Sequence, residues 1–109
     1  MESGFCQDEI FGPVVSLHAF DDDDHALALA NASRYGLAAS VWTDDLMRAH
    51  RIADELECGI VWINTWMQRD LRTPFGGMKQ SGFGREGGME AMTFFTEPKT
   101  VCIGALPNG

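Results

Sequence analysis

The chain has 109 residues, of which 45% are hydrophobic and 22% charged, as in an ordinary small globular domain. Its net charge is -8, which argues against a nucleic-acid binder and against an anionic membrane surface, because both need clustered Lys and Arg. No apolar run approaches the roughly 20 residues that span a bilayer, and the first residues do not resemble a secretory signal. We therefore predict a cytoplasmic protein with no nucleic-acid or membrane partner.

The three cysteines are widely spaced and none belongs to a C-x-x-C pair, which argues against a disulfide framework and against a structural zinc site. They are Cys6, Cys58 and Cys102. None has the basic neighbour or helix N-terminus that an activated thiolate needs. The histidines lack metal-ligand spacing, so we predict neither a metal site nor a cysteine nucleophile in this chain.

The first half of the chain alternates between strand and helix patterns. Residues 13–20 are apolar and β-branched at their start, which predicts a strand. The aspartates of residues 21–24 predict a helix start, because carboxylates accept the free N–H groups there. That helix is expected to end near Ser33, and the apolar run of residues 37–42 predicts a buried strand.

A second helix is expected after Thr43, which we predict to be its cap. Its apolar face has helical spacing, with one histidine alongside. The residues are Leu46, Ala49, His50, Ala53 and Leu56. Gly59 ends this helix, and residues 60–64 give the strongest strand pattern of the chain. Strands alternating with helices of this length predict an α/β fold built from parallel β-α-β units.

After Asn64 the periodicity disappears. Residues 65–88 contain six glycines and one proline, and so long an irregular stretch in a compact domain is usually functional. A short helix at residues 89–94 and a strand at residues 99–103 follow. So few strands leave a sheet edge or face uncovered, which predicts that other polypeptide covers it.

Two features of the irregular stretch are candidates for binding. Residues 82–87 match G-x-G-x-x-G, but the dinucleotide fingerprint needs a strand directly before it, so we interpret these glycines as turn residues. Arg69 and Arg72 lie beside aromatic residues, and arginine can bind a carboxylate through two parallel hydrogen bonds. Alternatively, Arg69 pairs with Asp70, or both arginines are surface residues.

Six motifs of this sequence, in order and at fitting spacings, resemble those of the aldehyde dehydrogenase superfamily. They lie at residues 8–13 (D-E-I-F-G-P), 35–37, 59–64, 74–79, 81–86 and 96–100. The resemblance extends from about Cys6 to Ile103. It implies that residues 1–97 are an incomplete C-terminal part of the catalytic domain, and that residues 98–109 are an oligomerisation strand and tail.

The resemblance also implies chemistry that this chain does not contain. In the family, a cysteine thiolate attacks a small-molecule aldehyde, NAD accepts a hydride, and a glutamate base activates water to release the acid. Both catalytic residues lie upstream in the family, so we expect this chain to be inactive alone. Its partners would then be the remainder of the dehydrogenase and other subunits. The alternative is a non-catalytic interaction module of the same fold.

The resemblance assigns residue roles as well. It implies that Glu9 binds the hydroxyls of the nicotinamide ribose and that Phe11 packs near the nicotinamide. Residues 66–77 are most similar to dehydrogenases for 2-hydroxymuconic and 2-aminomuconic semialdehyde, whose substrates carry a carboxylate. Arg69 is then the first candidate to bind that carboxylate and Arg72 the second, with Phe75 lining the same channel. A dehydrogenase for a different aldehyde is the alternative.

Overall fold

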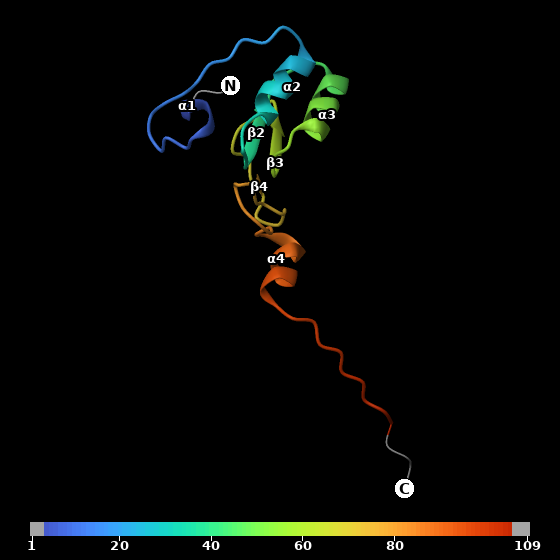
Figure 1. Cartoon of the computed structure of the whole chain (residues 1–109). Helices are drawn as coiled ribbons and strands as arrows, with labels where there is room; N and C mark the ends of the chain where they lie inside the picture. Colours follow the sequence, from blue (N-terminus) through green and yellow to red (C-terminus); the bar gives the residue numbers. More distant parts are fainter. Residues whose placement is uncertain (1–3, 106–109) are drawn as a thin grey trace.

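The computed structural model describes residues 4–105 (Figure 1). Three long segments of the described residues, 8–22, 64–77 and 96–105, contain no helix or strand. In chain order the elements are α1 (Gly4–Gln7), α2 (Asp23–Asn31), β1 (Tyr35–Gly36), β2 (Ala38–Val41), α3 (Leu46–Glu55), β3 (Ile60–Ile63), β4 (Met78–Lys79) and α4 (Gly88–Phe95).

The strand pair β2–β3 is parallel and joined by α3, so the predicted β-α-β unit is confirmed. Ala38 lies opposite Ile60, and Val41 lies opposite Ile63. The strand predicted at residues 37–42 is confirmed as β2, Ala38–Val41, and a short strand that was not predicted precedes it at Tyr35–Gly36. That strand, β1, pairs antiparallel with β4 and brings the irregular stretch back against the first half of the chain.

A small hydrophobic core forms where α2, α3 and β3 meet. It consists of Leu27, Ala49, Ile52 and Trp62, each at most 9% exposed. The predicted apolar face of α3 was partly wrong, since Leu46 is 69% exposed and His50 is also exposed. The buried stripe of α3 is centred on Ala49 and Ile52, whereas Leu46 lies in the first helical turn, where no described residue covers it.

Aspartates cap both of the longer helices. The carboxylate of Asp22 accepts a hydrogen bond from the His25 backbone N at 2.8 Å, as the acidic run predicted. The predicted Thr43 cap is wrong: Asp45 accepts from the backbone N of Met47 and Arg48, at 2.9 and 3.1 Å. One carboxylate at that position reaches two free N–H groups of the first turn. These donors, that of Arg48 first, lower the pKa of Asp45.

Two predicted strands are absent. Residues 13–20 and 99–103 are irregular and exposed, with Leu17 at 90% and Ile103 at 91%. An extended segment becomes a strand only when a neighbour satisfies its backbone hydrogen bonds, and no described segment pairs with either one. The predicted pairing of residues 98–109 with another subunit is not tested by a single chain.

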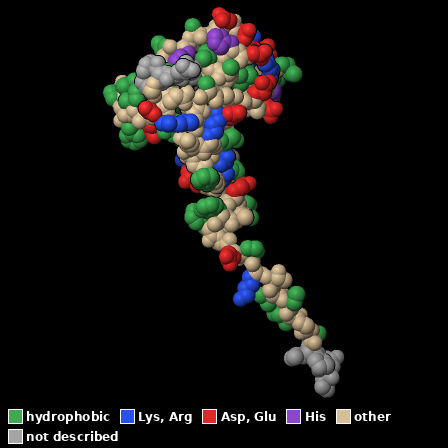
Figure 2. Space-filling view, in the orientation of Figure 1, with side chains coloured by type: hydrophobic (Ala, Val, Ile, Leu, Met, Phe, Trp, Pro, Cys, Tyr) green, Lys and Arg blue, Asp and Glu red, His purple; other side chains and the backbone are tan. Residues whose placement is uncertain are grey.

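The molecule is long and exposes much apolar surface. Its radius of gyration is 20.7 Å and its extents are 81 × 33 × 22 Å, whereas a compact domain of this length has a radius of gyration of about 13 Å. Its accessible surface is 9001 Å², against roughly 6,000 Å² for a compact 12 kDa protein. Figure 2 shows hydrophobic side chains along the narrow part of the molecule that contains α4.

One glycine holds the irregular stretch close to β3. A Cβ added to Gly59 would lie 1.5 Å from the carbonyl oxygen of Gly76 and 3.3 Å from that of Leu37. No side chain fits into that space, because the obstruction is backbone on both sides. The entry to β3 and the stretch after residue 64 are therefore packed against each other.

We predict that the isolated chain self-associates, because its exposed apolar side chains and uncovered strand edges can pack against and pair with other copies of the chain. Analytical ultracentrifugation at micromolar concentration is expected to show oligomers or aggregates. A single compact 12 kDa species would contradict this prediction and would favour an autonomous module.

Candidate functional site

The stretch that carries the candidate arginines leaves β3 at its carboxyl end, where parallel sheets commonly bind ligands. Asn64 makes the turn with a φ of 52°. Its side-chain amide accepts from the Thr43 backbone N at 2.8 Å and donates to the Thr43 carbonyl at 2.7 Å. The amide thus satisfies both backbone groups of Thr43 and ties the ends of β2 and β3 together.

Trp62 anchors the residue directly before Arg69. Its ring lies in the core, 8% exposed, and its indole N–H donates to the Gln68 carbonyl at 2.8 Å. The ring also meets Trp66 edge to face, with centroids 5.2 Å apart. A buried aromatic side chain thereby fixes the backbone position of a segment that has no regular structure.

Arg69 is held from two sides. Its guanidinium carbon lies 4.5 Å from the centroid of the Phe75 ring, and its Nη2 donates to the carboxylate of Glu86. Phe75 and Glu86 are opposite each other in an antiparallel bridge, with both backbone N–O distances at 2.8 Å. Phe75 and Glu86 thus both contact Arg69, but the two line a different cavity from the one that Arg69 lines, so the predicted common channel stays a prediction.

Arg72 is engaged elsewhere. Its Nε donates to both carboxylate oxygens of Asp70, at 2.9 and 3.1 Å, and its Nη2 donates to the same carboxylate at 2.5 Å. This guanidinium lowers the pKa of the Asp70 carboxyl. Asp70 therefore pairs with Arg72, and the alternative in which it pairs with Arg69 is wrong. The Arg72 side chain is 89% exposed, against 41% for Arg69.

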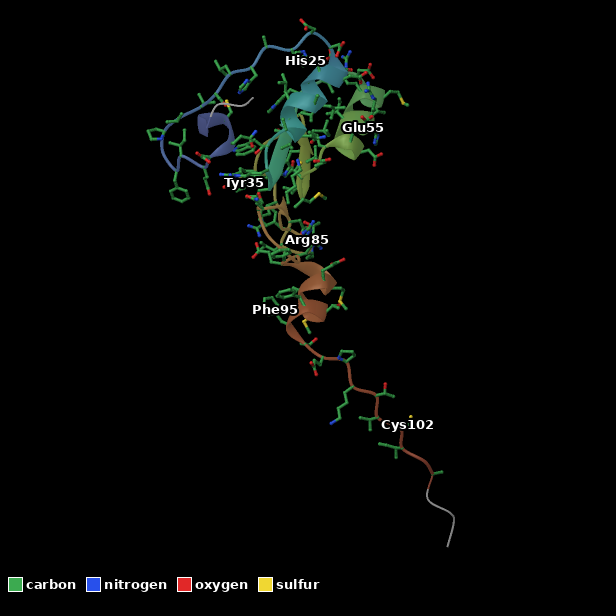
Figure 3. The ribbon with its side chains drawn as sticks, viewed as in Figure 1. His25, Tyr35, Glu55, Arg85, Phe95 and Cys102 are labelled. Atoms are coloured by element: carbon green, nitrogen blue, oxygen red, sulfur yellow. The ribbon has the colours of Figure 1, made fainter. Side chains whose placement is uncertain are left out.

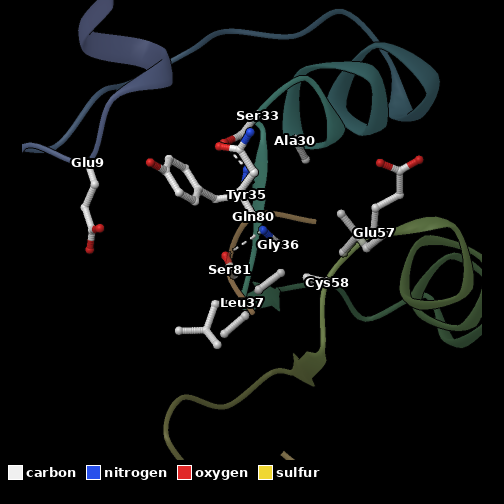
Figure 4. A pocket seen from close by; sticks show the side chains of 13 residues that line it. Glu9, Ala30, Ser33, Tyr35, Gly36, Leu37, Glu57, Cys58, Gln80 and Ser81 are labelled. Atoms are coloured by element: carbon white, nitrogen blue, oxygen red, sulfur yellow. Dashed lines mark hydrogen bonds between the residues drawn. The ribbon is translucent and has the colours of Figure 1, made fainter. Parts of the chain in front are cut away.

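Both arginines line one cavity of about 760 Å³. Its wall consists of Ile60, Trp62 and residues 68–73. Glu9 lies elsewhere, on a second cavity of about 600 Å³ lined also by Tyr35, Gly36 and Ser81 (Figure 4). Phe11 is 93% exposed with a φ of 54°. This chain therefore does not bring the candidate cofactor residues into the cavity of the candidate substrate residues.

Polar contacts connect the segments around the second cavity. The Gly36 backbone N donates to the Ser81 hydroxyl at 2.9 Å. The ammonium of Lys79 donates to the carbonyls of Asn31 and Ser33 and forms an ion pair with Glu57 at 2.6 Å. In Figure 3, Tyr35 of this region lies between His25 and Arg85 along the length of the molecule.

Cys58, on the wall of the second cavity, is not activated. Burial raises the pKa of its thiol, and the nearby Lys79 ammonium opposes this rise only in part. The thiol donates to the Ile60 carbonyl at 3.5 Å. A cysteine nucleophile needs a lowered pKa. The raised pKa of the Cys58 thiol therefore argues against Cys58 as a nucleophile.

The glycines of residues 82–87 serve turns. Gly84 and Gly87 have φ values of 70° and 77°, which side chains rarely adopt. The strand before them, β4, has two residues and runs antiparallel to its partner. A parallel β-α-β context is therefore missing, and the interpretation of these glycines as turn residues is confirmed.

Two residues of this site escaped the sequence analysis. Glu86 lies 17 positions from Arg69, and Trp62 was assigned only to a strand. No spacing rule links an irregular segment to a distant carboxylate, so Glu86 could not have been found. The buried position of Trp62 was a usable signal, because a buried indole N–H needs an acceptor.

Solved structures share this fold. The chain superposes on HpcC from Thermus thermophilus with a TM-score of 0.86 and 48% identity, covering 97% of this chain and 21% of that one. It also superposes on betaine aldehyde dehydrogenase from Staphylococcus aureus in complex with NAD+, with a TM-score of 0.78 and 45% identity, covering 82% and 18%. This chain thus corresponds in structure to about one fifth of each of these longer chains.

The model of the aldehyde dehydrogenase family matches residues 1–101, so the chain belongs to that family. It is 51% identical over 102 residues to 2-hydroxymuconic semialdehyde dehydrogenase of Pseudomonas putida. It is 52% identical over 101 residues to betaine aldehyde dehydrogenase of Rhizobium leguminosarum bv. trifolii. These matches cover 94% and 93% of this chain, and it spans only about a fifth of the length of each relative, 21% in both cases.

Among residues 4–105, no helix is long and apolar enough to cross a membrane.

We predict that Cys58 reacts slowly with iodoacetamide at neutral pH and faster as the pH rises, since its raised pKa keeps the thiolate scarce. The exposed Cys102 serves as the internal control, and peptide mass spectrometry measures both. Faster labelling of Cys58 than of Cys102 at neutral pH would contradict a half-buried, protonated thiol at Cys58.

Proposed function

We propose that this chain is the C-terminal part of the catalytic domain of an NAD-dependent aldehyde dehydrogenase that oxidises a carboxylated semialdehyde to the acid. The observation that carries the substrate class is the guanidinium of Arg69, stacked on Phe75 and lining a cavity. A substrate carboxylate can bind such a group through two parallel hydrogen bonds. The similarity to 2-hydroxymuconic semialdehyde dehydrogenase supports the same class.

The hydrogen-bond donors of the site favour this substrate over a cationic one, although each guanidinium is also paired with a carboxylate in this chain. The chain is as similar to betaine aldehyde dehydrogenase as to the muconic enzyme, so overall identity does not choose between them. Betaine aldehyde carries a quaternary ammonium group, which the guanidinium groups of Arg69 and Arg72 would repel at close range. A carboxylated aldehyde is attracted by the same two groups.

The proposed cofactor is NAD, which accepts the hydride when it is bound. Glu9 is exposed on the rim of a cavity, so its two carboxylate oxygens are accessible to the hydroxyls of a ribose. The Phe11 ring is 93% exposed and offers a flat surface to a planar base. The residues present therefore fit the roles proposed for them in binding the nicotinamide half of the cofactor.

The remainder of the enzyme is proposed to supply the nucleophilic cysteine, the glutamate base and the cover that this chain lacks. Two findings support this. The chain is only about a fifth as long as its relatives, and its elongated form nevertheless superposes closely on part of a solved chain. We further propose that residues 98–109 pair with another subunit, which would satisfy the unpaired backbone of residues 99–103.

The isolated 109-residue chain is expected to show no aldehyde oxidation, because the proposed nucleophile and base lie outside it. NADH formation is followed by absorbance with 2-hydroxymuconic semialdehyde and with hexanal, and a heat-treated sample gives the background. Turnover clearly above that background would show that the chain is catalytically complete.

In the complete dehydrogenase, Arg69→Ala is expected to lower kcat/KM for 2-hydroxymuconic semialdehyde by roughly 30-fold or more, because losing one partner of a desolvated charge pair costs about 2–5 kcal/mol. Arg69→Lys should rescue only in part, since an ammonium lacks the planar fork. Steady-state kinetics measure each variant.

Hexanal, an aldehyde of similar length without a carboxylate, is the control for this variant and should be oxidised about equally well before and after the change. Arg72→Ala should have the smaller effect, since Asp70 already engages that guanidinium. Equal losses for both aldehydes would mean that Arg69 only shapes the loop, and the substrate class would be withdrawn.

A further inference from the structure

We propose that Glu86 sets the strength of carboxylate binding at Arg69 by competing with the substrate carboxylate for the same guanidinium nitrogen. This inference rests on the proposed function and adds a specificity-determining residue to it. The observation behind it is the ion pair between Arg69 Nη2 and a Glu86 carboxylate oxygen.

The Glu86 carboxylate is held beside Arg69 by the backbone. Residues directly opposite each other in an antiparallel bridge carry their side chains on the same face. Phe75 and Glu86 form such a bridge, with both N–O distances at 2.8 Å. The ring and the carboxylate are therefore presented together, and Arg69 contacts both.

The geometry of a guanidinium makes Nη2 the decisive atom. An arginine binds a carboxylate through two N–H groups along one edge, either Nε with Nη2 or Nη1 with Nη2. Both edges include Nη2, and Glu86 occupies that nitrogen. Nη2 has one N–H on each edge, so a substrate carboxylate either displaces Glu86 or binds the other edge and shares Nη2 with it. When Nη2 is shared, the two carboxylates lie close together and repel each other.

The pair is weak enough to be displaced. The side chains of Arg69 and Glu86 are 41% and 60% exposed, and exposed ion pairs contribute little to stability. The Phe75 ring keeps the guanidinium in place through cation–π contact while Glu86 moves away. A weakly bound anion therefore does not displace Glu86 from Arg69. An aldehyde whose other contacts hold its carboxylate close to Arg69 does.

The test is Glu86→Gln in the complete dehydrogenase. Glutamine keeps the size of the side chain and an oxygen that accepts from Arg69, and it removes only the negative charge. We expect KM for 2-hydroxymuconic semialdehyde to fall by about threefold or more, as relief of like-charge repulsion requires. Both kinetic constants for hexanal, and kcat for the carboxylated aldehyde, should stay within about twofold of the parent values.

Two further variants isolate the effect. Glu55→Gln removes a carboxylate that pairs with Arg51 on α3, at similar exposure, and should leave every constant unchanged. In an Arg69→Ala background, Glu86→Gln should no longer change KM, because the shared guanidinium is gone. If Glu86→Gln fails to fold, as shown by loss of its melting transition, Glu86→Met tests the same removal of charge.

The outcomes separate this inference from the proposed function. An unchanged or raised KM in the neutral variant would overturn the competition. A kcat loss shared by both aldehydes would also overturn it and would assign Glu86 to the reaction or to the loop. If Arg69→Ala leaves KM for the carboxylated aldehyde unchanged, the proposed substrate class itself fails. If Arg69→Ala raises KM and Glu86→Gln does not lower it, only the role of Glu86 fails.

Discussion

The hydrogen bond from the Trp62 indole to the Gln68 carbonyl, at 2.8 Å, connects the only hydrophobic core of the described residues to the segment that carries the site. The ring is buried in the same core as Leu27 and Ile52, so the polar contact is fixed by apolar burial. Because burying an indole N–H without an acceptor is costly, the core and the backbone before Arg69 stabilise each other. The position of an irregular segment thereby follows from the packing of β3.

The chain has more acidic than basic residues, and its arginines form ion pairs with nearby carboxylates at several places. The acidic start of α2 is matched by arginines of α3, with Arg48 Nε 2.8 Å from Asp23 and Arg51 also pairing with Asp24. The cavity near Arg69 follows the same rule, with one carboxylate for each guanidinium. In a chain of net charge -8, an anion that binds at this cavity must therefore share a guanidinium with its acidic partner or displace that partner.

Short sequence patterns predicted most of the helices and strands that depend on interactions between neighbouring residues. The apolar runs of β2 and β3 and Gly59 after α3 were sufficient for a parallel β-α-β unit, and the aspartates before α2 predicted the start of that helix. The strands expected at residues 13–20 and 99–103 failed because a strand depends on a partner that this chain does not provide. At the site, arginine chemistry pointed to Arg69 and Arg72, and the family resemblance ranked Arg69 first. Glu86 depended on a long-range bridge that no periodicity encodes.

The contact between Gly59 and the Gly76 carbonyl has a consequence for genetics. A replacement at Gly59 would push on the loop that presents Phe75, although Gly59 lines neither of the two cavities described above. Because no side chain fits there, such an allele would disturb folding as well as the loop, and a changed substrate preference would not identify Gly59 as a binding residue. A screen for specificity in this segment would therefore recover steric lesions of the backbone together with changes in the binding groups.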